Sequence, residues 1–373
     1  MSDLAVTVAP PDVSRERAAG QRTRRFCRIR QGPPRQFAPS VAGERLRLIR
    51  VNDGKWVNGT HLTYGFFENN QFSNWAGNES LKIQVRKAFE RWAELRIGLS
   101  FEETVNRSAA QVRIGFETGD GHWSYVGTQL LDQGVDDRTM NLDPDDGIEN
   151  GAYGVDVACH EIGHTMGFPH EHQNPNAGIV WNEEAVYRAL GESPNYWSRE
   201  TTFENIIRKI PADAVQGSSW DPNSIMHYPF EPGLIAEPEQ YRQSGLRPAG
   251  GLSSRDGQWV KTFYPPLTAS DYEELPLLAS RRLSISPGGQ RNFVLKPKAN
   301  RYYEISTFGR SDTVAVLFER DPGGEDVYVT ADDDSGEERN AYIRRRLDAN
   351  RVYVLRLRLY YAADAGETAV MWW

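Results

Sequence analysis

The chain has 373 residues, of which 39% are hydrophobic and 25% are charged, and its formal net charge is −8. This composition is that of a globular protein that can bury a core, and the length favours two domains. The acidic balance argues against nucleic acid as the main partner, and no run of about eighteen apolar residues indicates a membrane span.

Residues 1–44 form a predicted leader with a basic run. Residues 15–35 hold eight arginines and a single acid, Glu16, which favours a flexible, solvated segment. The apolar stretch from Leu4 to Val8 is too short for a secretory signal. We therefore expect a protein that is cytoplasmic, already trimmed, or exported by a route that leaves no such signal.

Residues 45–266 carry the patterns of a mixed α+β domain. Alternation predicts a strand in residues 45–51, and aromatic and β-branched residues predict strands in 61–67, 99–103 and 111–116. Asn78 or Ser80 can cap a helix that runs to about Leu95, with an apolar face made of Leu81, Val85, Ala88, Phe89 and Trp92.

Two features follow before the next helix. A turn at residues 119–122 opens a strand that carries Trp123, Ser124 and Tyr125. Asp143 then begins an acidic loop, DPDDG, for which a solvated turn is the simpler interpretation and a calcium site the alternative.

The stretch from His160 to His170 reads HEIGHTMGFPH and predicts a zinc site. On a helix His160 and His164 project from one face, because they lie four residues apart. Gly167 has no Cβ, so a left-handed turn there would bring His170 back as a third ligand. Glu161 can act as the general base toward a water at the open fourth position. Three histidines and a water describe a catalytic site, since structural zinc sites are closed by four protein ligands.

Further helices and a second motif follow. We expect helices in residues 181–190 and 195–210, and a last helix that starts near Ser253 and ends before Pro265. Between them lies SIMHY, residues 224–228, the Met-turn that should follow a metzincin zinc motif. We expect Met226 to be a buried apolar support beneath the metal site.

The motifs HEIGHTMGFPHEH and SIMHY together resemble the astacin family of metzincin zinc endopeptidases. The two family patterns, HExxHxxGFxHE and SxMHY, are matched at His160, Glu161, His164, Gly167, Phe168, His170, Glu171, Ser224, Met226, His227 and Tyr228. The resemblance covers roughly residues 45–266. It implies a twisted mixed sheet with an active-site helix.

The resemblance also implies roles for particular residues. It makes Tyr228 an additional zinc ligand that swings away to stabilise the transition state. It places Trp123, Ser124 and Tyr125 on an edge strand that binds an extended peptide, whereas the alternative is that these side chains only cover the sheet. It gives Glu171 the task of anchoring a new amino terminus after a cut upstream of Arg45. The alternative for Glu171 is an exposed position at the helix exit.

Cys27 and Cys159 are the only cysteines, so the chain cannot form two disulfides and departs there from the family's extracellular members. Cys27 motivates a latency hypothesis, in which its thiolate takes the fourth zinc position until the leader is removed as a propeptide. The arginines around Cys27 would lower the pKa of its thiol. An idle cysteine is the alternative, because the family usually uses an aspartate for this purpose. Cys159 is expected to be a small buried residue.

Residues 270–373 change character. Short alternating runs between Gly-, Asp- and Asn-rich turns predict a small all-β sandwich, which resembles the prepeptidase C-terminal domains of many bacterial secreted peptidases. The turn of Asp332, Asp333 and Asp334 is expected to be a solvated hairpin rather than a calcium site. The segment has no histidine, so binding or stabilisation is a more suitable role for it than catalysis.

We therefore predict a monomeric zinc metalloendopeptidase that cleaves protein or peptide substrates with one zinc ion per chain. Glu161 is the predicted base, and Tyr228 the predicted donor to the developing oxyanion. Two alternatives are a non-catalytic protein that binds through its sandwich and a zinc hydrolase of non-peptide substrates. A preference for acidic substrate side chains stays open because of four basic residues, Arg188, Arg199, Arg208 and Lys209.

Overall fold

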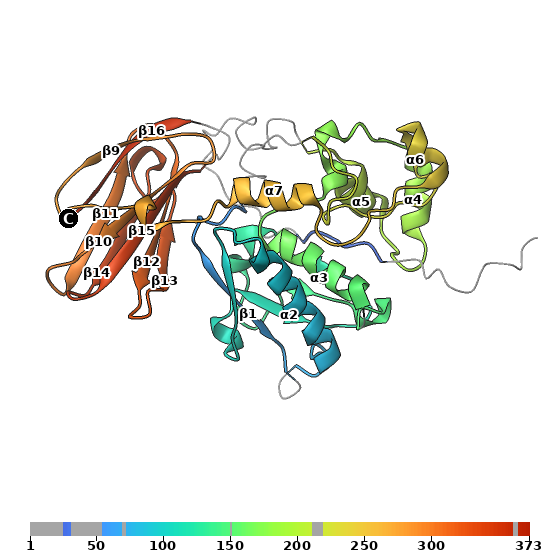
Figure 1. The fold of residues 1–373 in the computed structure, drawn as a ribbon, viewed down its shortest axis with the longest axis horizontal. Coiled ribbons are helices and arrows are strands. Elements are labelled where there is room, and N and C mark those ends of the chain that lie inside the picture. Colours follow the sequence, from blue (N-terminus) through green and yellow to red (C-terminus); the bar gives the residue numbers. More distant parts are fainter. Residues whose placement is uncertain (1–24, 31–53, 69–71, 150, 211–218, 361–364) are drawn as a thin grey trace, which may run out of the picture.

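A computed structural model describes residues 25–30, 54–68, 72–149, 151–210, 219–360 and 365–373. The predicted strand in residues 45–51 lies outside these ranges, as does most of the basic run. Within them the chain forms a mixed α+β part and a C-terminal part made of strands (Figure 1). The first part is of the predicted α+β class, whereas the assignment of the second part to a small sandwich domain and the exact domain boundaries stay predictions.

The first part is built on a five-stranded sheet with the order β2-β1-β3-β5-β4. Its strands are β1 (His61–Phe66), β2 (Ser100–Glu103), β3 (Val112–Gly115), β4 (Trp123–Ser124) and β5 (Met140–Asn141). All neighbours are parallel except β4, which runs antiparallel to β5 and lies at the edge. The predicted edge position of the Trp123 strand is therefore confirmed.

Two long helices pack on each other beside this sheet (Figure 1). In α2 (Glu79–Glu94) the Asn78 side chain accepts a hydrogen bond from the backbone of Leu81, so Asn78 rather than Ser80 is the cap. The apolar face predicted for this helix is buried. Trp92 of α2 donates from Nε1 to the Cys159 carbonyl of α3 (Gly151–Thr165) at 3.1 Å. This contact fixes the metal-motif helix against the core.

Shorter elements complete the first part. They are α4 (Glu183–Gly191), α5 (Arg199–Thr202), α6 (Glu239–Ser244), α7 (Ser254–Phe263), β6 (Val180–Trp181) and β7 (Ile235–Glu237). The predicted helix in 195–210 is shorter than expected, because α5 passes at once into a π-helical turn, Phe203–Ile207. Short 3-10 turns lie at Arg107–Ala109, Gly127–Asp132, Pro144–Asp146, Glu171–Gln173, Pro175–Ala177, Ala269–Asp271 and Glu337–Arg339.

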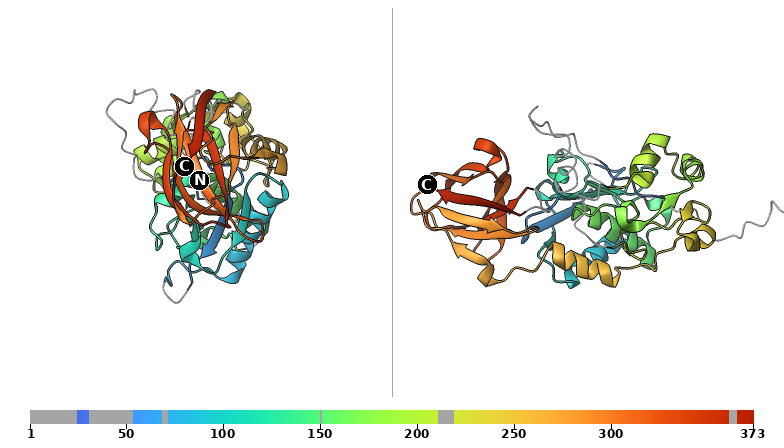
Figure 2. Two further views of the ribbon diagram at one scale, coloured as in Figure 1. Left: turned by 90° about the vertical axis from the view of Figure 1, so that its left-hand side faces the viewer. Right: turned by 90° about the horizontal axis from the view of Figure 1, so that it is seen from above.

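The C-terminal part consists, among the described residues, of two sheets that share a hydrophobic core. One has the order β13-β12-β15-β10-β8 and the other β14-β11-β16-β9 (Figures 1 and 2). The strands are β8 (Tyr272–Glu274), β9 (Arg281–Ile285), β10 (Gln290–Leu295), β11 (Arg301–Phe308), β12 (Thr313–Arg320), β13 (Asp326–Asp332), β14 (Tyr342–Leu347), β15 (Val352–Leu359) and β16 (Gly366–Trp372). In the DDD turn, Asp332 accepts hydrogen bonds from the backbone of Ser335 and Tyr342.

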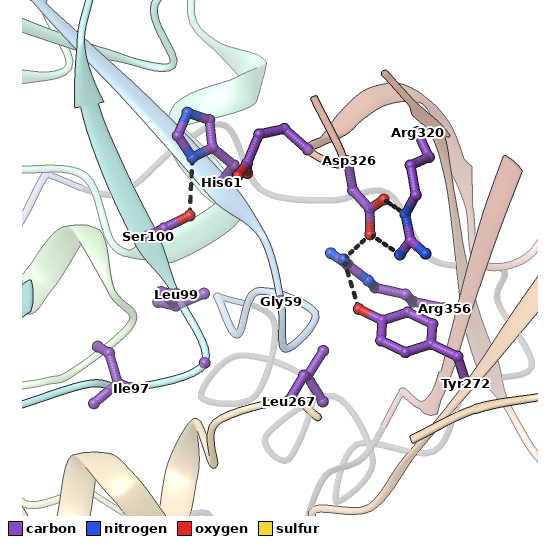
Figure 3. Close-up of a pocket in the computed structure, with 13 residues that line it drawn as sticks. Gly59, His61, Ile97, Leu99, Ser100, Leu267, Tyr272, Arg320, Asp326 and Arg356 are labelled. Atoms are coloured by element: carbon purple, nitrogen blue, oxygen red, sulfur yellow. Dashed lines mark hydrogen bonds and ion pairs between the residues drawn. The ribbon is translucent and has the colours of Figure 1, made fainter. Parts of the chain in front are cut away.

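The two parts contact each other directly. The Gln290 side chain accepts from the Asn58 backbone and donates to the Asn58 carbonyl, both at 2.8 Å. Arg358 donates from Nη2 to the Lys55 carbonyl at 2.9 Å. Beside these contacts lies a pocket in which Asp326 stands between Arg320 and Arg356 (Figure 3). In the ranges that are described, no helix combines the length and apolarity that a membrane crossing requires.

Candidate metal centre

The metal-motif helix and its exit bring three histidines together. His160 and His164 lie on α3, and Gly167 follows with a φ of +95°, the predicted left-handed turn. The turn is closed by two hydrogen bonds, from Gly167 N to the His164 carbonyl at 2.8 Å and from Phe168 N to the Gly163 carbonyl at 3.0 Å. His170 then points back, and all three imidazoles are buried.

The three Nε2 atoms have the spacing that a tetrahedral metal requires. His164 Nε2 lies 3.1 Å from His160 Nε2 and 3.1 Å from His170 Nε2. Zinc bonds of about 2.0–2.1 Å to two ligands of a tetrahedron place those nitrogens about 3.3 Å apart. Cys27 Sγ completes the group, and its four ligand atoms lie within 4.8 Å of one another. The buried cluster could therefore hold a metal ion.

The surroundings keep these imidazoles neutral and oriented. His160 donates from Nδ1 to the Ile225 carbonyl and His164 donates from Nδ1 to the Phe168 carbonyl, both at 2.7 Å. Each Nε2 lone pair is then free for a metal. Burial lowers the pKa of His160 to about 4, and burial with the neighbouring histidines lowers those of His164 and His170 well below the ordinary value. Neutral imidazole is the form that binds zinc.

Glu161 is fully buried beside the cluster. Its Oε2 accepts a hydrogen bond from Cys27 Sγ at 3.4 Å, and its Oε1 has no hydrogen-bond partner within the described part of the chain. Burial raises the pKa of Glu161 to about 8. The carboxyl is thus placed where the predicted general base should stand, next to the position that the cysteine occupies.

The Met-turn lies directly against the metal helix. A Cβ added to Gly163 would lie 2.3 Å from the Met226 sulfur, so Met226 can pack against this helix only because Gly163 has no side chain. Met226 is buried, as predicted. The preceding residues are held by Asp256, which accepts from Ser224 Oγ at 2.7 Å and from the Ile225 backbone at 2.8 Å.

Tyr228 closes the site on the side opposite the helix. Its hydroxyl donates to the Cys27 carbonyl at 2.7 Å and lies in short contact with His170 Nε2. Its ring stacks on His160 with 5.3 Å between centroids. Burial raises the pKa of Tyr228 well above the ordinary value, so the phenol stays protonated and can donate.

Residues 25–30 of the leader occupy the site, which corrects the prediction of a solvated segment. Phe26 packs its ring 4.9 Å from Tyr228 and 5.7 Å from Phe230. The backbone amides of Phe26 and Ile29 donate to the side chains of Asn195 and Asn205, at 2.9 and 3.1 Å. Sequence reasoning missed both asparagines, because nothing in their neighbourhood along the chain indicates a contact with the leader.

The arginines near Cys27 do not act as predicted. Burial and then the adjacent Glu161 raise the pKa of the Cys27 thiol well above its ordinary value, and Arg28 opposes this only as the smallest effect. The thiol is therefore protonated in this arrangement, and a bound metal ion would supply the charge that favours a thiolate. Cys27 and Cys159 are both buried and free.

The leader pairs with the predicted edge strand. Arg28 donates from its backbone to the His122 carbonyl at 3.1 Å, and Arg30 forms a parallel bridge with Tyr125. With the leader in place the side chains of Trp123 and Ser124 are buried, and the strand offers the leader both its backbone and the Trp123 ring, on which Arg30 stacks at 3.8 Å. This arrangement agrees with peptide binding by strand addition, a role that stays a prediction for substrates.

Two simpler interpretations are wrong. Glu171 is not an exposed glutamate, since it is half-buried and accepts from the Asp221 backbone at 3.0 Å. Burial raises its pKa to about 7. Asp143 is not in a solvated turn, because its buried carboxylate accepts from the backbones of Gly119 and Gly121 and pairs with Arg25 at 2.8 Å.

Two of the arginines considered for acidic substrates already have partners. Arg199 pairs with Glu184 at 2.6 Å, and Arg208 is in short contact with Glu204. Their charges are partly neutralised, which weakens the argument for an acidic substrate.

Comparisons with known proteins agree with the metal site. Residues 55–181 match the sequence model of the Peptidase_M10 family, the matrixins. Blastula protease 10 of Paracentrotus lividus is 28% identical over 163 residues, which span 41% of this chain and 22% of that protein. Metalloendoproteinase 1-MMP of Arabidopsis thaliana is 31% identical over 135 residues, which span 32% of this chain and 36% of that protein. The chain thus spans well under two thirds of the length of these relatives.

The fold comparison points the same way. The structure of myroilysin is 28% identical to this chain and has a TM-score of 0.52, and the match covers 58% of this chain and 98% of that one. Together with the buried histidine and cysteine cluster, these similarities support a metzincin zinc metalloprotease domain in this chain.

Proposed function

We propose that this chain is a zinc endopeptidase whose metal ligands are His160, His164 and His170. The observation that carries the proposal is the pair of 3.1 Å distances among three buried Nε2 atoms, with Glu161 buried beside them. When bound, zinc would supply a Lewis acid for the peptide carbonyl and for a water molecule.

The chain's own residues supply proton transfer and hydrogen bonding. Glu161 accepts the proton of the attacking water and returns it to the leaving amine. While the leader covers the site, burial raises the pKa of this carboxyl to about 8. The Tyr228 hydroxyl, released from the Cys27 carbonyl, donates to the developing oxyanion. An extended substrate replaces the leader along β4.

The astacin subtype is the finer part of this proposal. It rests on the complete SxMHY turn and on Tyr228, whose hydroxyl reaches His170 Nε2 and whose ring stacks on His160. In this subtype Glu171 would receive a new amino terminus after a cut in the leader. Among the described residues, its half-buried carboxyl accepts from neutral amide donors, the Asp221 backbone and the Asn174 side chain.

The proposed function also includes latency, which the leader imposes. Cys27 Sγ belongs to the same cluster as the three histidines and donates to Glu161, so one side chain covers both the fourth metal position and the base. The leader held in this way excludes substrate and water. We propose that the chain is inactive until the leader moves away.

The base is tested by Glu161→Ala. The full-length variant should keep its fold and its zinc, measured by circular dichroism and metal analysis, and should cleave a denatured protein at least about 100-fold more slowly. Glu183→Ala, which removes an exposed carboxylate from α4, is the matched control and should cleave at the normal rate. Retained cleavage by purified Glu161→Ala would sink the assignment.

The proposed inhibition of the site by Cys27 is tested by Cys27→Ala. Removing the thiol uncovers the fourth metal position, so the full-length variant should cleave peptides at least about tenfold faster than the unmodified chain. Cys159→Ala removes the other buried thiol without touching the cluster and should give no activation. Equal rates for Cys27→Ala and the unmodified chain would dismiss the latency proposal.

A further inference from the structure

The leader places two of its arginines against carboxylates near β4. Arg25 Nη1 lies 2.8 Å from Asp143 Oδ2, and Arg30 Nη2 lies 3.2 Å from both carboxylate oxygens of Asp120. The two carboxylates differ in what else binds them. Asp143 already accepts three backbone amides, from Gly119, Gly121 and Asp145, and so has a structural role without any arginine.

Asp120 belongs to a site that fits a guanidinium from two directions. The Arg30 guanidinium carbon lies 3.8 Å from the centre of the Trp123 ring, so the planar cation stacks on the indole face. The same indole donates from Nε1 to Asp120 Oδ2 at 2.9 Å, which fixes the carboxylate beside the ring. Trp123 is only 1% exposed while Arg30 covers it, and the bond to Asp120 orients its indole.

The carboxylates around Asp120 favour a cation at this site. Arg138 lies 3.0 Å from Asp120 and in short contact with Glu117, so one positive charge faces two carboxylates. Within the part of the chain that the structure describes, one negative charge is left, and Arg30 neutralises it. When the leader departs, that charge and the indole face are both uncovered.

We propose that Asp120 and Trp123 form a substrate subsite that selects an arginine side chain in the peptide that replaces the leader. This inference rests on the proposed peptidase function. Backbone pairing along β4 is independent of sequence, so side-chain sites of this kind must provide the selectivity. The guanidinium of the substrate takes the place of that of Arg30, the residue that forms the bridge with Tyr125. Arg28 is exposed and defines no comparable site.

The test uses the full-length chain with zinc and with Cys27→Ala and Arg30→Gln, which together weaken the hold of the leader and free the subsite. Quenched fluorescent peptides share one neutral sequence, and arginine, its neutral analogue citrulline, or glutamate is scanned through every position. We expect one position at which arginine exceeds citrulline by about 5- to 20-fold in kcat/KM, with glutamate the poorest.

Asp120→Asn in the same background should reduce that ratio to below about twofold. Asp145→Asn removes an exposed charge nearby and should leave the ratio unchanged. Cleavage without an arginine preference, or a preference that survives Asp120→Asn, overturns the subsite. The arginine-to-citrulline ratio is measured with Asp120 intact, so the proposal is decided even if the Asp120→Asn chain does not fold.

Failure of the peptidase proposal would look different, because no peptide would then be cleaved at all. Fluorescence anisotropy decides the subsite in that case. A labelled arginine peptide should bind the same full-length background at least about fivefold more tightly than its citrulline counterpart, and equal affinities overturn the proposal.

Discussion

At the scale of single residues, burial rather than charge determines the chemistry of the cluster. Burial is the largest cause of the shifted pKa of His160, Glu161 and Cys27 alike. It keeps the imidazole neutral for a metal and favours the protonated form of the Glu161 carboxyl while the leader covers the site. Arg28, one of the arginines predicted to activate Cys27, has little influence on the pKa of the thiol, because its side chain is exposed to solvent.

Gly163 shows how closely this cluster is packed. Gly163→Ala should destabilise the protein by about 1–3 kcal/mol and weaken zinc binding, because a Cβ 2.3 Å from the Met226 sulfur displaces the Met-turn. Thermal unfolding and zinc competition with a chromophoric chelator measure the two effects.

Gly257→Ala is the matched control, since Gly257 lies inside α7 and its nearest neighbour would be 3.5 Å away. A new Cβ there should be neutral or stabilising by up to about 1 kcal/mol, through helix propensity alone. Similar effects of the two alanines would show that the Met226 contact does not limit the site.

At the scale of elements, α7 supports the metal site through one carboxylate. Asp256 closes the capping box of α7, where the Ser253 backbone donates to it at 2.8 Å, and it also receives the Ile225 backbone at 2.8 Å. The carbonyl of Ile225 in turn orients His160. Although α7 contributes no candidate metal ligand, it therefore holds His160 in place.

Asp256→Ala should cost roughly 2–4 kcal/mol of stability and also lower zinc affinity, because it removes the cap and the Met-turn bonds together. Ser253→Ala loses the hydroxyl of the same cap but keeps the bonds from Asp256 to Ser224 and Ile225, so it should cost about 1 kcal/mol and leave zinc affinity unchanged. Equal zinc affinity in the two variants would contradict this coupling.

At the scale of the whole molecule, the contact between the two parts buries like charges. Lys55 is 6% exposed, its ammonium lies 4.2 Å from the centre of the Phe263 ring, and Arg358 of the C-terminal part binds its carbonyl. Burial, and then the charge of Arg358, lower the pKa of Lys55 to about 7. The folded protein therefore disfavours the charged form of this side chain.

This shift predicts how stability depends on pH. Between about pH 7 and the ordinary lysine pKa of about 10.5 the unfolded chain binds one proton more than the folded chain, so stability rises with pH by up to about 1.4 kcal/mol per unit. Below about pH 7 both states bind the proton and the full cost of the buried cation is present.

Lys55→Met should remove this contribution to the slope. The variant should be more stable than the unmodified chain at pH 7, and the difference should shrink toward pH 10, as measured by thermal unfolding at several pH values. Parallel curves for the two proteins would show that Lys55 is not a buried cation in solution.

The sequence alone determined the local features of this protein. The spacing of His160 and His164 and the left-handed turn at Gly167 depend on residues a few positions apart and were predicted correctly, because helix and turn geometry are local. The same reasoning reduced the helix cap to Asn78 or Ser80, of which the structure shows Asn78. The alternating strands after residue 270 were legible for the same reason.

Only the tertiary structure decided which distant residues meet. Phe26 reaches Asn195, Cys27 reaches Glu161, and Arg30 stacks on Trp123 across separations that no periodic pattern encodes. Desolvation followed from these contacts. It reversed the predicted pKa of Cys27 and the expected exposure of Asp143, and it excluded the exposed alternative for Glu171. The motif HEIGHTMGFPH thus specified a helix whose histidines could hold a metal ion. The protonation state of these histidines, their cover by the leader and the proposed subsite at Asp120 and Trp123 arise from the packing of segments far apart in the chain.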